Sequence, residues 1–198
     1  ILLIVSNPMD TMTTLAQKVS GLPTNRVFGM GGALDSARFR GYLAKALGAS
    51  ANDVDGMVIG GHGDTTMIPL VSKASYKGVP VSEFLDEKTL GEIAAATMVG
   101  GALTKMLGTS AWYAPGAAAA RIVESIINDE KKVFPSCVHL EGQYGQDDLY
   151  IGAPAVIGRN GAEKVIEINL NETEKAAFAK SAEAVRNTNK VLYEIGAL

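Results

Sequence analysis

The chain has 198 residues, of which 47% are hydrophobic and 20% are charged, and its formal net charge is −3. This composition is typical of a globular protein with enough apolar side chains for one substantial core. The slightly negative charge gives no basic surface for nucleic acid. Cys137 is the only cysteine, so an intramolecular disulfide is excluded and a cytoplasmic location is expected. No segment reads as a membrane span.

The first predicted element is a strand over residues 1–5, a continuous apolar run typical of a buried strand in a parallel sheet. A helix at 10–20 and a short strand at 26–30 follow. In open α/β sheets ligands bind beyond the carboxyl ends of the strands, which would place Asn7 beside a bound molecule. Asn-Pro is also a common turn signal, and Pro8 permits a cis peptide bond. Both interpretations of Asn7 stay open on this pattern.

The next predicted helix runs from Ala33 to about Leu47 and carries Asp35 and Arg38 on one face, because residues three apart are neighbours on a helix. One interpretation is an exposed ion pair, which contributes a few tenths of a kcal/mol. The other gives each group its own partner. A carboxylate can orient a protonated imidazole, and a guanidinium can bind a substrate carboxylate through two parallel hydrogen bonds.

A histidine between glycines ends the next apolar run, in the sequence Val-Ile-Gly-Gly-His-Gly-Asp-Thr-Thr at residues 58–66. Imidazole can take and return a proton near neutral pH, and the flanking glycines allow a ligand to approach closely. His62 is therefore the predicted reactive centre. The alternatives are a glycine-rich turn without function and a metal-ligand pair with Asp64 in a hydrolase. No further His, Asp or Glu lies nearby at ligand spacing, so no metal is expected.

The rest of the chain is predicted to be scaffold. Trp112 and Tyr113 are expected in the core or in an interface, and His139 is expected to be structural or to lie at a subunit contact. The predicted elements are a strand at 67–74, a helix at 87–106 with a bend at Gly100-Gly101, a helix starting at Pro115 and running to Asn128, a strand at 133–140, and strands at 149–157 and 163–168 joined by a hairpin turn at Arg159-Asn160-Gly161.

The last predicted helix begins with Asn171 as its N-cap and Glu174 three residues later, which is the arrangement of a capping box. Its apolar residues keep helical spacing, so we expect the helix to pack against the rest of the domain. These residues are Phe178, Ala182, Val185, Leu192 and Ile195.

Three motifs in this order resemble the lactate/malate dehydrogenase family: Asn7-Pro8, Leu34-Asp35-Ser36-Ala37-Arg38-Phe39 and Gly61-His62-Gly63-Asp64. Each motif is weak alone, but all three fall at a predicted strand end or helix start. The segments at 108–118, 140–145 and 157–161 are similar to the same family. The resemblance covers essentially the whole chain.

The resemblance implies a fold that is α/β and α+β. Residues 1–29 would be the trailing strand-helix-strand of an NAD-binding Rossmann domain, and residues 30–198 the mixed α+β substrate-binding domain. The family's G-x-G-x-x-G loop does not appear, since Gly29-Met-Gly-Gly32 lacks its spacing. We therefore expect this chain to be the C-terminal part of a longer enzyme.

Carried over by position, the resemblance makes His62 the catalytic acid/base and Asp35 its orienting partner. Arg38 would bind the C1 carboxylate of the substrate. Asn7 would contact the substrate and the nicotinamide ribose. Val5 would lie against the nicotinamide ring of the cofactor.

Ser110 would line the substrate pocket in the same resemblance. The implied activity is NAD-dependent interconversion of malate and oxaloacetate, with L-lactate oxidation as the alternative. Gly61, where lactate enzymes commonly have Glu, and the segment at 110–115 favour malate. Self-association into a dimer or tetramer is implied as well. A further alternative is an inactive fragment that acts only in oligomer assembly.

Overall fold

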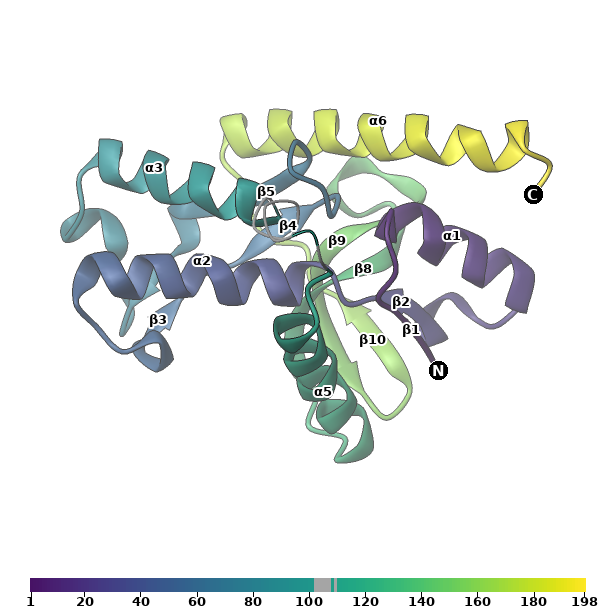
Figure 1. The fold of residues 1–198 in the computed structure, drawn as a ribbon, viewed down its shortest axis with the longest axis horizontal. Helices are drawn as coiled ribbons and strands as arrows, with labels where there is room; N and C mark the ends of the chain where they lie inside the picture. The colour runs from purple at the N-terminus through teal and green to yellow at the C-terminus, as the bar shows by residue number, and fades with distance from the viewer. Residues whose placement is uncertain (102–107, 109) are drawn as a thin grey trace.

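A computed structural model describes residues 1–101, 108 and 110–198. Its main feature is a seven-stranded mixed sheet in the order β1-β2-β8-β9-β4-β5, with β10 paired to β9 (Figure 1). Strands and helices are mixed along the chain, which confirms the predicted α/β and α+β class. The main helices are α1 (Met9–Ser20), α2 (Gly32–Leu47), α3 (Glu87–Met98), α5 (Tyr113–Ile127) and α6 (Glu172–Glu194), and the strands are β1 (Leu2–Ile4), β2 (Val27–Gly29), β3 (Val54–Asp55), β4 (Val58–Gly60), β5 (Met67–Pro69), β6 (Ser75–Tyr76), β7 (Val79–Pro80), β8 (Lys132–Glu141), β9 (Asp147–Gly158) and β10 (Gly161–Val165).

The first strand is parallel to β2, as predicted, and α1 connects the two. Within the described chain this strand is not buried: Leu2 is 38% exposed and Val5 is 43% exposed. The reason is that β1 is the edge strand and pairs with β2 alone in the sheet order. On its other side β2 pairs antiparallel with β8 through Gly29 and Cys137, so the sheet continues past residue 30. The domain boundary at that position stays a prediction.

The centre of the sheet is the long β8–β9 hairpin, whose register runs from Lys132 opposite Ile157 to Glu141 opposite Asp147. Its inner positions form the main apolar core together with side chains from α1 and α6. The predicted hairpin turn before β10 is confirmed, and Gly161 adopts φ +97° there, where L side chains are strained. The fully buried members of this core include Phe28, Ile59, Ile122, Leu140, Ile151 and Ile157.

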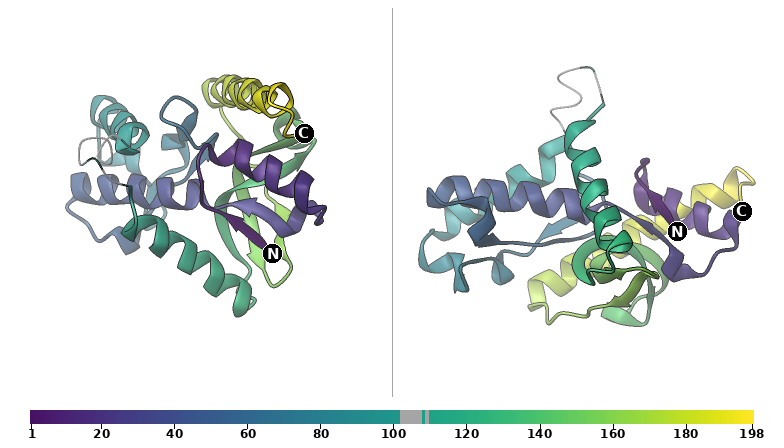
Figure 2. Two further views of the ribbon diagram at one scale, coloured as in Figure 1. Left: turned by 45° about the vertical axis from the view of Figure 1, so that its right-hand side comes forward. Right: turned by 90° about the horizontal axis from the view of Figure 1, so that it is seen from below.

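The helices lie on two sides of the molecule (Figure 1). The helices α1 and α6 are adjacent, and the Thr11 Oγ1 donates to Asn189 Oδ1 over 2.8 Å. On the other side α2 packs against α3, and Figure 2 shows α5 running crosswise to α2. A second apolar core between α2 and α3 includes Phe39, Leu43 and Leu90. None of the helices in the described ranges has the length and apolar character that a membrane span requires.

Several predicted boundaries differ from the structure, including the strand expected at 163–168, which is observed over Gly161–Val165. The strand expected over 67–74 ends at Pro69, because the chain turns at Leu70 into a 3-10 helix over Val71–Lys73. The helix expected from Pro115 begins earlier, at Tyr113, since proline is tolerated within a first turn whose N–H groups lack helical partners. The helix α3 ends at Met98 and is followed by a 3-10 turn over Val99–Gly101, where the bend was predicted. The predicted continuation over 102–106 lies outside the described residues.

The capping box of α6 is confirmed. Asn171 Oδ1 accepts from the Glu174 N–H over 2.9 Å, and Glu174 Oε2 accepts from the Asn171 N–H over 3.0 Å. The predicted apolar face packs inward from Phe178 to Leu192. Ile195 does not belong to it: this residue is 68% exposed because it lies at the C-cap, beyond the last helical residue.

Candidate active site

The loop that carries His62 follows the end of β4. Its conformation is set by the turn at Gly60 and by hydrogen bonds to α6 and α1. Gly60 adopts φ +84°, which turns the chain out of the strand. The Gly61 N–H donates to Ser181 Oγ of α6 over 2.9 Å, and this hydroxyl donates to the Thr66 carbonyl over 2.7 Å. On the side of α1, the His62 N–H donates to Asp10 Oδ2 over 2.8 Å. The loop therefore has a defined conformation although it is rich in glycine.

The imidazole of His62 contacts the carboxylate of Asp35, as predicted. The distance between His62 Nδ1 and Asp35 Oδ2 is 2.6 Å, and the two side chains are 15% and 2% exposed. His62 lies in the loop after β4 and Asp35 in the first turn of α2, so the fold joins two residues that are 27 positions apart. With Nδ1 occupied, Nε2 makes no hydrogen bond within the described part of the chain and is the nitrogen available to a substrate.

Burial disfavours the charged imidazole, but the hydrogen bond and negative charge of Asp35, together with the charge of Asp10, outweigh that effect. The pKa of His62 is therefore raised from its ordinary 6.5, and the positive charge of Arg38 opposes the rise only in part. An imidazole suits a group that must accept a proton in one direction of a reaction and donate it in the other, and the raised pKa favours its protonated form.

Arg38 and Asp35 form the i,i+3 contact, but the pair is not an exposed one, since the Asp35 side chain is 2% exposed and also contacts His62. The binding of a substrate carboxylate by Arg38 stays a prediction. Arg38 Nη1 lies 3.4 Å from Asp35 Oδ1 and 3.4 Å from the Thr97 carbonyl oxygen. Both contacts are long for hydrogen bonds, and the side chain is 23% exposed. The guanidinium is thus placed beside the His62–Asp35 pair with donors left for a carboxylate.

Two residues of this site were missed from the sequence. A Cβ on Gly100 would overlap the guanidinium end of Arg38, so the absence of a side chain there makes room for it. The pattern of residues indicated only a bend at Gly100. Asp10 was predicted only as the first residue of a helix, and no short-range signal links it to a histidine 52 residues away.

The remaining predicted site residues are Val5, Asn7 and Ser110, and all three are exposed. Asn7 and Val5 follow β1 and are exposed, and the Asn7–Pro8 peptide is cis. Ser110 is exposed and makes no hydrogen bond with His62 among the described residues. The roles predicted for these three residues remain predictions. His139 contacts Asp148 Oδ1 through Nε2 over 3.0 Å on the β8–β9 hairpin.

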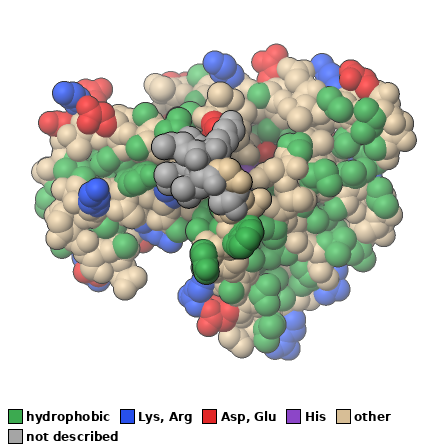
Figure 3. All heavy atoms as spheres, in the orientation of Figure 1, with side chains coloured by type: hydrophobic (Ala, Val, Ile, Leu, Met, Phe, Trp, Pro, Cys, Tyr) green, Lys and Arg blue, Asp and Glu red, His purple; other side chains and the backbone are tan. Residues whose placement is uncertain are grey.

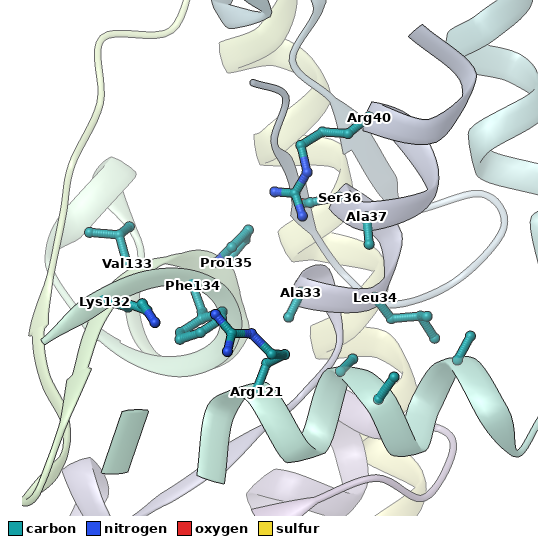
Figure 4. A pocket seen from close by; sticks show the side chains of 13 residues that line it. Ala33, Leu34, Ser36, Ala37, Arg40, Arg121, Lys132, Val133, Phe134 and Pro135 are labelled. Carbon is teal, nitrogen blue, oxygen red and sulfur yellow. The ribbon is translucent and has the colours of Figure 1, made fainter. Parts of the chain in front are cut away.

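One mainly apolar cavity lies away from His62, between α2, α5 and the start of β8 (Figure 4). Its volume is about 450 Å³, and Arg40 and Arg121 reach into it from the two helices. None of His62, Asp35 and Arg38 lines it. Within the described ranges, no three His, Cys, Asp or Glu side chains are arranged to hold a metal ion.

Large apolar side chains are exposed on α5 and at its start, where Figure 3 shows them gathered. Trp112 is 71% exposed and Tyr113 is 92% exposed, so their expected place in the core is wrong. Trp112 is the N-cap of α5 and Tyr113 is its first residue. The helix packs inward through Ile122, and Ile127 at its end is 69% exposed. An interface for these side chains stays a prediction.

Comparison with known proteins agrees with this geometry. Residues 32–194 match the model of the lactate/malate dehydrogenase α/β C-terminal domain, and the chain belongs to the lactate/malate dehydrogenase family. The chain is 63% identical to the malate dehydrogenase of Bacteroides thetaiotaomicron over 199 residues, which is 100% of this chain and 64% of that relative. It therefore spans just under two thirds of the length of this relative.

Solved structures from both branches of the family superpose on the chain. The malate dehydrogenase of Salinibacter ruber is 44% identical, with a TM-score of 0.93 over 98% of this chain and 65% of its own. The Cryptosporidium parvum lactate dehydrogenase complexed with lactic acid and nicotinamide adenine dinucleotide is 39% identical, with a TM-score of 0.93 over 96% of this chain and 62% of its own. The fold alone thus does not separate the two activities.

Proposed function

We propose that the complete enzyme containing this chain is an NAD-dependent malate dehydrogenase, with His62 as its acid/base. The observation that carries this proposal is the His62–Asp35 contact of 2.6 Å, which leaves Nε2 for the substrate. Neutral Nε2 accepts the hydroxyl proton of malate, and Asp35 stabilises the imidazolium that forms. In the reverse direction the imidazolium returns this proton to the carbonyl oxygen of oxaloacetate.

Arg38 is proposed to hold the substrate carboxylate next to the carbon that reacts. Its guanidinium cannot lose its proton at physiological pH, so the contact does not depend on the protonation of His62. This contact would serve any 2-hydroxy acid, since all of them carry a C1 carboxylate. Arg38 therefore supports the substrate class rather than malate in particular.

Val5 and Asn7 are proposed to meet the nicotinamide end of the cofactor. They fit this role because they are exposed and follow the carboxyl end of a parallel strand, where α/β sheets bind ligands. The helix that begins two residues after Asn7 also holds the His62 loop through Asp10. NAD, when bound, accepts hydride from the carbon that bears the hydroxyl group.

The preference for malate over lactate is supported by the relatives rather than by the geometry. The relatives that are 62–64% identical to the chain are named malate dehydrogenase. The test is a steady-state assay of the full-length enzyme with NADH and either oxaloacetate or pyruvate. We expect kcat/KM for oxaloacetate to exceed that for pyruvate by at least about 100-fold. A preference for pyruvate would make the enzyme a lactate dehydrogenase. Equal values would contradict the proposed preference for malate.

Self-association is proposed as well, through the exposed apolar residues of α5. Trp112, Tyr113 and Ile127 are exposed in the described chain, and exposed apolar clusters commonly mark interfaces. Light scattering of the full-length enzyme should give the mass of a dimer or tetramer. Ile127→Asp should lower that mass if α5 lies in the interface, and an unchanged mass would place the interface elsewhere.

A further inference from the structure

Asp10 occupies an unusual position for a carboxylate. It lies in the first turn of α1, is 8% exposed, and its Oδ2 accepts the His62 backbone N–H over 2.8 Å. Its other oxygen, Oδ1, is buried without a hydrogen-bond partner in the described part of the chain. Buried polar atoms without partners are uncommon and costly. The position thus needs an explanation beyond folding stability.

The neighbours of Asp10 do not neutralise it. The hydroxyl of Thr13 donates to the Met9 carbonyl oxygen. The thiol of Cys137 lies beside the carboxylate, and burial together with the charge of Asp10 raises the pKa of this thiol well above its ordinary value, so the thiol stays uncharged. Burial also raises the pKa of Asp10 itself, while hydrogen bonds from the His62 N–H and the Cys137 thiol, and then the charge of His62, oppose that rise.

The first turn of α1 holds both loops that frame the site. Met9 Sδ accepts the Gly31 N–H over 2.9 Å at the entry to α2, and Asp10 accepts the N–H of His62. A neutral amide could accept the same N–H without burying a charge. What a carboxylate adds is a negative charge next to the His62 loop, on the side of α1, whereas Asp35 and Arg38 face the imidazole from α2.

We propose that Asp10 is a positioning residue for His62, which fixes the backbone of the His62 loop and places a second buried negative charge beside it. This inference rests on the proposed function, in which His62 is the acid/base. In that reaction the charge of Asp10 adds to that of Asp35 and stabilises the imidazolium formed when malate is oxidised.

The first experiment separates the charge from the hydrogen bond. Asp10→Asn keeps an acceptor for the His62 N–H and removes the charge. In full-length enzyme, NMR titration of the His62 ring should show its midpoint lowered by about half a pH unit or more. The pH at which kcat/KM for malate rises should fall by the same amount. The control variant Glu92→Gln, which removes an exposed carboxylate on α3, should move neither value.

The second experiment adds the loss of positioning. Asp10→Ala removes both the charge and the acceptor, so kcat should fall by a further factor of about 10 or more beyond that of Asp10→Asn, while KM for NADH stays within about 2-fold. Equal kcat values for the two variants would overturn the positioning role.

The third measurement needs no substitution and stands even if both variants fail to fold. Hydrogen exchange of the wild-type enzyme should show the His62 amide more protected than the amide of exposed Asp64, because the His62 amide is bonded to a buried carboxylate. An unprotected His62 amide, or an unchanged His62 midpoint in folded Asp10→Asn, would overturn the proposal. Because these two readouts do not involve turnover, they remain decisive if the enzyme proves inactive on malate, an outcome that would count against the proposed function alone.

Discussion

The His62 loop and the rim formed by Val5 and Asn7 differ in how far this chain completes them. The His62 loop is held by hydrogen bonds from α1 and α6, and its imidazole is fixed against a nearly inaccessible carboxylate. The rim is exposed and follows the edge strand of the sheet. The chain therefore holds the imidazole of His62 in a fixed position by itself, whereas the described residues do not enclose the surface proposed for the cofactor.

The strongest test of this contrast is His62→Asn in the full-length enzyme. An asparagine cannot exchange a proton near neutral pH, so kcat should fall by about 10²–10⁴-fold. The affinity for NADH, measured by fluorescence titration, should stay near that of the wild type because the rim is untouched. Unchanged turnover would remove His62 from the mechanism.

Arg38→Lys tests the group beside the enclosed pair. An ammonium cannot form two parallel hydrogen bonds with a carboxylate, so KM for oxaloacetate should rise by roughly 10- to 100-fold. Steady-state kinetics at saturating NADH give this value. A wild-type KM would show that the substrate carboxylate binds elsewhere.

Asn7→Ala tests the rim itself. Because Asn7 is exposed, its loss should change the free energy of unfolding by less than about 0.5 kcal/mol. The apparent affinity for NADH should nevertheless fall by roughly 5- to 10-fold, which corresponds to the loss of about one hydrogen bond. Urea denaturation and NADH titration measure the two effects. A large loss of stability with normal NADH affinity would make Asn7 a structural residue.

Gly100→Ala sharpens the contrast without touching a charged group. The new methyl group would displace the guanidinium of Arg38, so KM for oxaloacetate should rise by about 3- to 10-fold with a smaller change in kcat. Gly91→Ala is the matched control, since a Cβ there meets open space on α3. It should leave KM unchanged and stabilise the helix by about 0.5–1 kcal/mol. Identical kinetics for both variants would contradict the contact with Arg38.

The smallest expected effect is on stability as a function of pH. The pKa of His62 is raised in the folded chain, so its protonation stabilises folding; this contribution is complete below the ordinary value of 6.5 and is lost as the pH rises through the raised value. The stability of wild type relative to His62→Gln should therefore begin to fall near pH 6.5 and keep falling until the pH has passed the raised value. Urea denaturation across that range measures it, and a difference that grows with pH would reverse the assigned direction.

Much of the fold was predictable because its signals are local. The capping box of α6, the Asn-Gly turn before β10 and the parallel first strand each depend on residues close together in the chain. The predictions that failed depended on partners. The core position considered for Trp112 and the length of the strand after His62 are decided by what packs against those segments rather than by their own apolar character.

The sequence by itself determined the residue types of the site and their order: an imidazole between glycines, and a carboxylate and a guanidinium on one turn of a helix. Only the tertiary structure decided which of them meet. It joined Asp35 to His62 at 2.6 Å, placed Arg38 against Gly100, and brought Asp10 of α1 to the His62 backbone. The physical reason is that these contacts join residues 27 to 62 positions apart, whose approach depends on the packing of helices around the sheet and not on local spacing.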